Sequence, residues 1–416
     1  MHILSYMDYD ITNEDRQGLQ ECLLILIDDY IDNNIKLYSN EKFLTEVYVA
    51  IFDITKKLYC IEIVPEFIIR SVLNDSMSYY FKTVGIPRSC DTFNALQSEE
   101  EKQRIQSHLE VLGNISQEIQ KTDAWFIKRH EMLTASSIWK ALDTQSSQNS
   151  LIYNKCQPIN IKKYNNVNIT LPFHHGHKYE PLSTQFYEQL YDTTISEWGC
   201  LPHKLHDFLG ASPDGINSKY NNSRYGRLLE IKNIVNREIN GIPIKKYWIQ
   251  MQLQMEVTGI SHCDFLETRF KEFETEAEFD KGDSFHLTDD GKMKGIFVQL
   301  QGTSGPVYKY PPFQCNKETF DLWYEKCLDD NPYLSWVKNI HWWLEEYSCV
   351  VVQRNEKWFK DVLPAFKDIW DTIIKERITG FDHRKPKKRA KKKPQNVLLK
   401  VRTESFSDTQ LDEESK

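Results

Sequence analysis

The spacing of hydrophobic residues changes along the chain and separates expected helices from expected strands. Leu182, Phe186 and Leu190 recur at helical spacing, which predicts a helix to about Tyr191 with Pro181 in its first turn. A second helix is expected over residues 247–257. Short runs rich in branched and aromatic residues predict strands over residues 208–211, 227–234, 263–270 and 295–300. The polar, Asn-rich segment 217–226 predicts a turn, so we expect the first two strands to form a β-hairpin.

The flanking regions have weaker patterns. Residues 1–115 mix helical and strand-like spacing and predict a small α/β or mostly helical accessory region, with strand character at 45–53 and 57–64. A helix–turn–helix is expected from Trp125 to Ala141, followed by a polar loop or partly helical insert over 142–170. Residues 320–378 are expected to be helical, with breaks near Pro332 and Pro364. The predicted organisation is an accessory region (1–115), an α/β main domain with a helical C-terminal part (116–376) and a disordered tail (377–416).

Charge narrows the possible functions. The formal net charge is −8, and the run from Arg384 to Lys393 contains eight basic residues, so the remainder carries −16. An acidic body argues against a general nucleic-acid coat protein and fits a carboxylate-rich cleft that binds metal. The basic run 384–393 has three interpretations: a nuclear localisation signal, a nonspecific DNA arm, or a solvated tail.

The cysteines and the apolar runs indicate a soluble intracellular protein. There are nine cysteines and no C-x-x-C pair, so we expect reduced thiols and neither a disulfide framework nor an iron–sulfur cluster. No signal peptide is recognisable at the N-terminus, and the apolar stretch Leu23 to Ile27 is too short to span a bilayer. No membrane association is therefore expected.

One group of residues carries recognisable chemistry. Asp214 and Glu230 lie sixteen positions apart, on either side of the predicted turn. Glu230 and Lys232 are two apart on one strand and therefore point to the same face, while Ile231 points into the core. Carboxylate oxygens, with the Ile231 carbonyl as a further ligand, are what Mg²⁺ prefers, and a nearby ammonium can stabilise developing charge on a phosphate. The alternative is an ordinary Pro-Asp-Gly turn beside a surface salt bridge.

The order P-D…E-x-K resembles the signature of the PD-(D/E)xK nuclease superfamily, and further segments resemble its branch of lambda-type exonucleases and YqaJ-like viral recombinases. The segment from Trp125 is similar to the W-x-x-x-R…T-A-S motif, and the resemblance implies that Arg129 and Ser136 hold a DNA 5′-phosphate. Gly176 to Glu180 is similar to G-x-x-x-E, which makes Glu180 a third acidic residue of the site.

The helix after the E-x-K strand adds another motif. Tyr247 to Gln254 resembles Y-x-x-Q-x-Q, and the resemblance implies that Gln250 contacts the catalytic lysine or the attacking water. Gln254 lies one turn beyond Gln250 on the same face. The resemblance covers about a third of the chain. It departs from the family after Glu180, where the small-Arg element often found there is missing.

The resemblance implies a restriction-endonuclease-like core, in which a central mixed sheet is flanked by helices. It implies a Mg²⁺-dependent exonuclease, with Mn²⁺ as a possible substitute, that digests linear double-stranded DNA from 5′ to 3′ in viral DNA recombination, repair or processing. Catalysis would rest on Glu180, Asp214, Glu230, Lys232 and Gln250. A homotrimer and a single-strand annealing protein as partner are also implied, in the host cytoplasm or nucleus.

Three rival functions remain open at this point. The first is a structure-specific or nonspecific endonuclease of the same fold, and the second is a catalytically inactive DNA-binding module. The third is a zinc-stabilised interaction protein, for which His174, His175 and His177 lack a recognisable ligand spacing. The aromatic segment around Trp336, Trp342 and Trp343 is expected to be core rather than a base-stacking platform.

Overall fold

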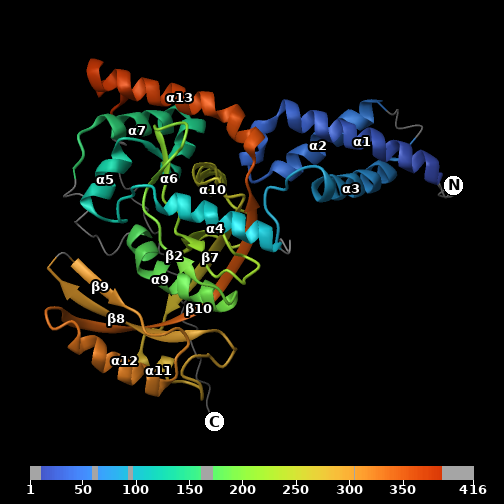
Figure 1. Cartoon of the computed structure of the whole chain (residues 1–416). Helices are drawn as coiled ribbons and strands as arrows, with labels where there is room; N and C mark the ends of the chain where they lie inside the picture. The colour runs from blue at the N-terminus through green and yellow to red at the C-terminus, as the bar shows by residue number, and fades with distance from the viewer. Residues whose placement is uncertain (1–10, 59–63, 92–96, 161–171, 304, 387–416) are drawn as a thin grey trace, which may run out of the picture.

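The first part of the chain is a group of helices that extends from the body of the molecule (Figure 1). The computed structural model describes residues 11–58, 64–91, 97–160, 172–303 and 305–386. The first helices are α1 (Asn13–Asn33), η1 (Ile35–Ser39), α2 (Phe43–Leu58), α3 (Glu66–Thr83) and α4 (Glu99–Gly113). Leu23, Val47 and Ile69 are fully buried where α1, α2 and α3 pack together. The helical form of the accessory region is confirmed. The strand character expected at 45–53 is wrong, since α2 covers it, and most of 57–64 lies outside the described residues.

A seven-stranded mixed sheet forms the centre of the molecule, in the order β2-β5-β6-β7-β10-β8-β9. The strands are β2 (Ile195–Ser196), β5 (Gly215–Asn217), β6 (Leu228–Asn233), β7 (His262–Glu272), β8 (Lys294–Gly302), β9 (Gly305–Lys309) and β10 (Ser335–Gln353). β6 and β7 are parallel, and the other neighbours are antiparallel. The predicted central mixed sheet is therefore present.

The prediction of a helical C-terminal part is wrong at β10. This strand lies inside the sheet between β7 and β8. In sequence, the helix α12 (Lys317–Asp329) precedes it and the helix α13 (Glu356–Thr379) follows it. Its buried side chains alternate through Ile340, Trp342 and Leu344, and pairing on both edges satisfies its backbone. The break near Pro332 is confirmed. Pro364 lies inside α13 and does not end it.

The strand at 208–211 also has a different partner from the one expected. It is β4 (Leu209–Ala211), which lies in a small second sheet between β1 (Leu133–Thr134) and β3 (Leu201–Pro202). The partner of β6 is β5, with Gly215 opposite Leu229. The hairpin therefore begins directly after Asp214, because the chain leaves the small sheet at Ala211 and enters the large one at Gly215.

Helices cover both faces of the large sheet. α9 (Pro172–Leu190) packs on the face that carries Leu229 and Ile231, while α10 (Lys245–Thr258) packs in the core that contains Leu228 and Phe265. The remaining helical segments are α5 (Asp123–His130), α6 (Ala135–Ile138), η2 (Trp139–Leu142), α7 (Gln145–Cys156), α11 (Glu276–Phe279) and η3 (Asp382–Arg384). No helix of the described residues is long and apolar enough to cross a membrane.

Two helix predictions need correction or restriction. Pro181 lies in the interior of α9 rather than in its first turn, because the helix begins nine residues earlier. The insert at 142–170 contains α7, and its part from residue 161 onward lies outside the described residues. Trp342 belongs to the core as expected, whereas Trp336 is about half exposed.

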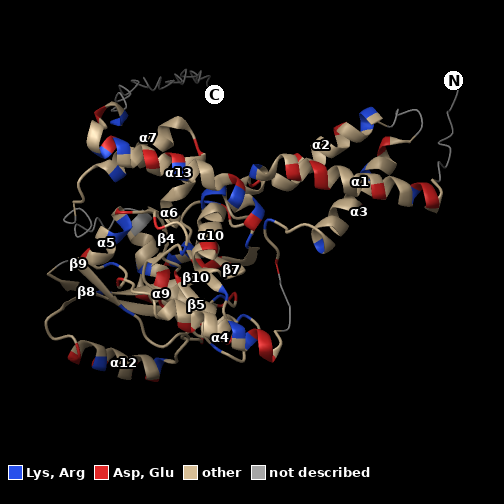
Figure 2. Ribbon diagram, turned by 45° about the horizontal axis from the view of Figure 1, so that its top comes forward, with Lys and Arg blue, Asp and Glu red and all other residues tan. Residues whose placement is uncertain are grey.

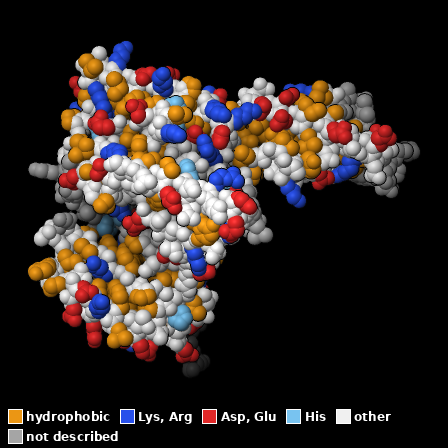
Figure 3. Space-filling view, in the orientation of Figure 1, with side chains coloured by type: hydrophobic (Ala, Val, Ile, Leu, Met, Phe, Trp, Pro, Cys, Tyr) orange, Lys and Arg blue, Asp and Glu red, His pale blue; other side chains and the backbone are white. Residues whose placement is uncertain are grey.

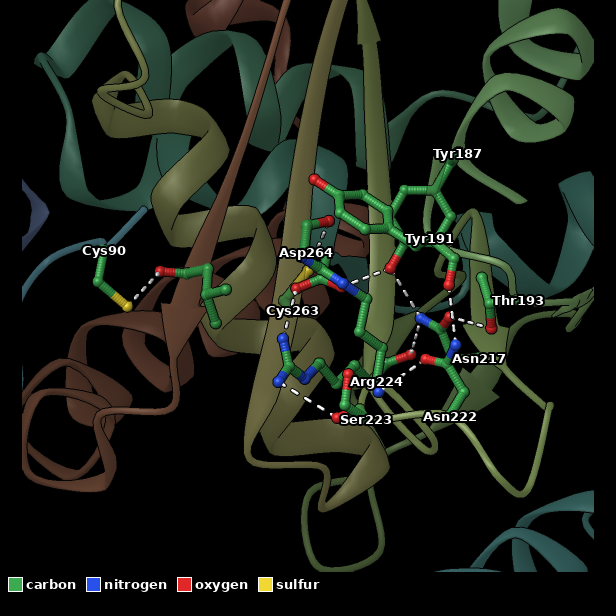
Figure 4. Close-up of polar contacts among 12 residues, drawn as sticks. Cys90, Tyr187, Tyr191, Thr193, Asn217, Asn222, Ser223, Arg224, Cys263 and Asp264 are labelled. Atoms are coloured by element: carbon green, nitrogen blue, oxygen red, sulfur yellow. Dashed lines mark hydrogen bonds and ion pairs between the residues drawn. The ribbon is translucent and has the colours of Figure 1, made fainter. Parts of the chain in front are cut away.

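A buried polar cluster fastens the β5–β6 turn to the sheet (Figure 4). The Asp264 carboxylate is fully buried and accepts hydrogen bonds from Arg224 (2.6 Å), Arg227 (3.3 Å) and the Tyr187 hydroxyl. Tyr187 in turn accepts a hydrogen bond from the amide of Asn217, 3.0 Å away. Because these residues come from α9, β5, the turn and β7, the cluster fixes the hairpin relative to its neighbours.

Candidate active site

The hairpin register brings Asp214 and Glu230 together. Asp214 directly precedes β5, and its carboxylate accepts a hydrogen bond of 2.7 Å from the backbone N–H of Ile231. Glu230 is fully buried on β6, and the Lys232 ammonium contacts it, as expected for two residues on one face of a strand. The Ile231 side chain is buried on the opposite face, against α9. The pattern read from the sequence is thus assembled in space.

Burial shapes the electrostatics of this group. Burial, and next the neighbouring charge of Asp214, raises the pKa of Glu230 to about 7. Burial raises the pKa of Asp214 to about 6, although Lys232 opposes this shift. Burial alone would lower the pKa of Lys232, but the carboxylates of Glu230 and Asp214 raise it, so the lysine stays an ammonium. Two carboxyls and one cation therefore lie together, with the Glu230 side chain fully buried and the Lys232 side chain 21% exposed.

Two glutamines of α10 orient Glu230 from the other side. Gln250 donates to one of its oxygens (2.7 Å) and Gln254 to the other (2.6 Å). The resemblance places Gln250 beside the lysine or a water, and the structure instead puts its amide on the carboxylate that Lys232 also contacts. Gln252 lies on another face, where it bonds the backbone of Gln353 and Asn355. The side-chain oxygen of Gln254 is buried without a hydrogen-bond partner.

Glu180 stands at the edge of the group. Its carboxylate lies 3.3 Å from the Lys121 ammonium and 3.7 Å from the ring of His177, and about a third of its side chain is exposed. Its charge contributes to the raised pKa of Asp214, so the two carboxylates face the same region. Lys121, which the sequence reasoning did not single out, has a left-handed backbone with φ of 68°. Nothing in the local sequence distinguishes it from other surface lysines.

The donor set fits a hard divalent cation. Asp214 and Glu230 offer carboxylate oxygens close to each other, since Asp214 contacts the backbone of Ile231, the residue after Glu230. Mg²⁺ usually needs only one or two carboxylates, with waters and substrate phosphates completing its shell. Burial is the main cause of the raised pKa values of both carboxyls, with a smaller contribution from neighbouring carboxylates, and a bound cation would oppose both effects. No group of three or more His, Cys, Asp or Glu side chains in the described ranges is placed to hold a metal. A cation here would therefore depend on substrate oxygens as well.

A second group of side chains, around Arg129, includes Ser212, which lies two residues before Asp214. Arg129 of α5 donates to the hydroxyls of Ser136 (2.8 Å) and Ser212 (3.2 Å), and its guanidinium stacks 4.2 Å above the ring of Trp125. The indole N–H of Trp125 also donates to Ser212, at 3.2 Å. The predicted pair of Arg129 and Ser136 is therefore formed. Ser212 joins it, although sequence gave no sign of this, because its contacts come from a helix more than eighty residues earlier.

The molecule is hollowed on one side (Figure 3). Figure 3 shows a hollow between the part of the molecule that carries α5 and α7 and the part that carries β8 and β9. Figure 2 shows Lys and Arg positions interspersed with Asp and Glu positions along α12 and α13. The basic run 384–393 lies outside the described residues from residue 387 onward.

The candidate site residues predicted from the sequence all lie within one segment that matches a known family. Residues 124–261 match the YqaJ-like viral recombinase domain. The matched segment contains α5, α6, α9, the β5–β6 hairpin with the preceding Asp214, and α10, which together carry the candidate site residues. The chain is also 29% identical, over 316 residues, to Uncharacterized protein R354 of Acanthamoeba polyphaga mimivirus. That match covers 65% of this chain and 55% of the relative, so the chain spans about half the length of the protein it matches.

Solved structures give a weaker likeness. An alkaline exonuclease, LHK-Exo, from Laribacter hongkongensis is 18% identical, with a TM-score of 0.36 over 62% of this chain and 94% of that one. LHK-Exo in complex with dAMP gives 17% identity and the same TM-score and coverage.

Proposed function

We propose that the protein is a Mg²⁺-dependent exonuclease that hydrolyses phosphodiester bonds of linear double-stranded DNA. The observation that carries this proposal is the assembly of Asp214, Glu230 and Lys232 around one point, two residues from a serine held by Arg129. Residues suited to hydrolysis lie beside side chains that can donate hydrogen bonds to a phosphate, and this arrangement suits a DNA substrate held by its end. The match to the YqaJ-like viral recombinase domain supports this function, in viral DNA recombination, repair or processing.

In the proposed mechanism, Asp214, Glu230 and the Ile231 carbonyl hold the cation. A bound divalent cation supplies Lewis-acid polarisation of the scissile phosphate. The Lys232 ammonium, kept charged by the two carboxylates, orients the attacking water and stabilises negative charge that develops on the phosphate oxygens. Gln250 and Gln254 keep Glu230 oriented by donating to both of its oxygens. Glu180 assists from the edge of the site.

The second group recognises the DNA end in this proposal. The forked guanidinium of Arg129 and the hydroxyl of Ser136 bind a terminal 5′-phosphate, which sets digestion from 5′ to 3′. Ser212 joins the two groups, because its hydroxyl contacts Arg129 while its chain leads into Asp214. Mn²⁺ as a substitute ion, a homotrimer and a single-strand annealing partner belong to the same proposal and rest on the family resemblance.

The test is digestion of linear duplex DNA carrying 5′-phosphates, with Mg²⁺ and with EDTA. We expect Mg²⁺-dependent loss of the DNA, abolished in Asp214→Ala and Lys232→Ala. Lys219→Ala is the matched control, since Lys219 lies on the same hairpin turn but pairs with Asp192 at 2.6 Å, and it should digest normally. DNA that stays intact while still being bound would overturn the proposal in favour of a catalytically inactive binding module.

A covalently closed circular duplex separates the exonuclease from the second candidate. An end-dependent enzyme leaves this substrate intact, whereas a structure-specific or nonspecific endonuclease nicks it. The contacts between Arg129, Ser136 and Ser212 favour the end-dependent enzyme, because they place hydrogen-bond donors for a terminal phosphate together, beside the candidate catalytic residues.

A further inference from the structure

The C-terminal end of α5, the helix that carries Arg129, is held by a lysine from another helix. The Lys155 ammonium of α7 donates to the backbone carbonyls of Arg129 (2.5 Å) and Met132 (2.6 Å). The last carbonyls of a helix lack partners within it, and a cation placed there also interacts favourably with the helix dipole. Lys155 therefore fixes the backbone of Arg129 itself and of the turn that leads to Ser136.

An arginine from the far end of the chain supports this lysine. Arg377 of α13 donates to the carbonyl of Lys155 (3.0 and 3.1 Å) and to that of His130 (3.4 Å), and it pairs with the carboxylate of Glu131 at 3.0 Å. Arg377 lies outside the segment 124–261 that matches the family model. The C-terminal helix therefore reaches the turn between Arg129 and Ser136 through Lys155 and Arg377.

Keeping a cation at this place has an electrostatic cost. Burial, followed by the charges of Arg129 and Arg377, lowers the pKa of Lys155 to about 7. Both of its hydrogen-bond acceptors are neutral carbonyls rather than carboxylates. The two hydrogen bonds to the Arg129 turn are what the lysine adds to packing.

We propose that Lys155 and Arg377 are positioning residues for recognition of the DNA 5′-phosphate. They hold the α5 terminus so that the Arg129 fork and the Ser136 hydroxyl face the same phosphate. This inference rests on the proposed function and extends it: α13, which lies beyond the matched domain, becomes part of the device that recognises DNA ends.

The test compares 5′-phosphorylated with 5′-hydroxyl duplexes of the same sequence in the full-length protein. Lys155→Met keeps the bulk of the side chain and removes its donors. We expect KM for the phosphorylated end to rise about tenfold, with kcat and the KM for the hydroxyl end nearly unchanged, as for the loss of hydrogen bonds that hold the Arg129 turn. Lys128→Met is the matched control, because Lys128 lies next to Arg129 on α5 but bonds the carbonyl of Ser116 at 2.9 Å.

Arg377→Lys keeps the positive charge but removes the forked guanidinium. This variant tests the positioning role if Lys155→Met fails to fold. A smaller rise in the same KM supports the proposal. Equal changes for both kinds of end, or no preference for the phosphate in the wild type, would overturn it. Binding of the two duplexes in EDTA, measured by fluorescence anisotropy, separates this outcome from failure of the proposed function. A protein that binds 5′-phosphate ends selectively, but loses selectivity in Lys155→Met, supports the positioning role even without hydrolysis.

Discussion

Replacement of Glu230 by glutamine should make the metal-free protein more stable and inactive at the same time. Glu230 is fully buried, and its pKa is raised from the ordinary value of 4.5 to about 7. The native state therefore holds the protonated carboxyl more readily than the unfolded chain does. Stability from this group is present below pH 4.5 and is lost as the pH rises through 7.

The magnitude follows from the two pKa values. One pH unit between them corresponds to about 1.4 kcal/mol, so the ionised carboxylate lowers the free energy of unfolding by about 3 kcal/mol at pH 8. Glutamine is neutral at every pH and has nearly the same shape. The buried oxygen of Gln254 has no hydrogen-bond partner, so rotation of that amide lets it accept from the new side-chain N–H. We therefore expect Glu230→Gln to recover most of the 3 kcal/mol at pH 8 and little at pH 4.5.

The assay is urea denaturation in EDTA at pH 4.5 and at pH 8, alongside DNA digestion in Mg²⁺. Glu99→Gln is a matched control, because the hydrogen bond from Lys102 lowers the pKa of Glu99 and gives the opposite pH trend. An equal change in the free energy of unfolding at the two pH values, or a less stable Glu230→Gln protein at pH 8, would contradict this prediction.

Two further predictions concern the surroundings of the site. Gln254→Leu removes one donor to Glu230 and should lower kcat/KM about tenfold and raise the Mg²⁺ requirement, as outer-shell changes typically do. Gln252→Leu, on another face of the same helix, should leave the Mg²⁺ titration unchanged, and equal effects would count against this role. Asp264→Ala leaves two arginines without their buried partner and should lower the free energy of unfolding by about 3–5 kcal/mol. Urea denaturation measures this loss, with Asp75→Ala as the control. Asp75 forms an exposed ion pair with Arg16, so its replacement should change the free energy of unfolding little.

Local sequence was enough to find the candidate site. The two-residue period of a strand sets Glu230 and Lys232 on one face and Ile231 on the other, whatever the rest of the fold. The helical period likewise puts Gln250 and Gln254 together and Gln252 apart. These relations depend only on backbone geometry over a few residues, and the structure shows each of them.

Strand pairing could not be predicted in the same way. The segment around β10 contains helix-compatible residues, and it is a strand because β7 and β8 satisfy its backbone on both edges. The segment 208–211 resembles any short apolar strand, and its assignment to the small sheet depends on β1, which lies about seventy-five residues earlier. Pairing energy of this kind comes from contacts between distant parts of the chain, which local propensity does not contain.

The side chains of the candidate site could be predicted from local spacing: two carboxylates, a lysine and two glutamines, which backbone periodicity places on shared faces. Their surroundings depend on how distant elements pack. The tertiary structure placed Ser212 against Arg129, Lys121 beside Glu180, and Lys155 with Arg377 behind the α5 terminus. The physical reason is that a hydrogen bond between residues far apart in sequence exists only after packing has brought their elements together, and no spacing along the chain records it.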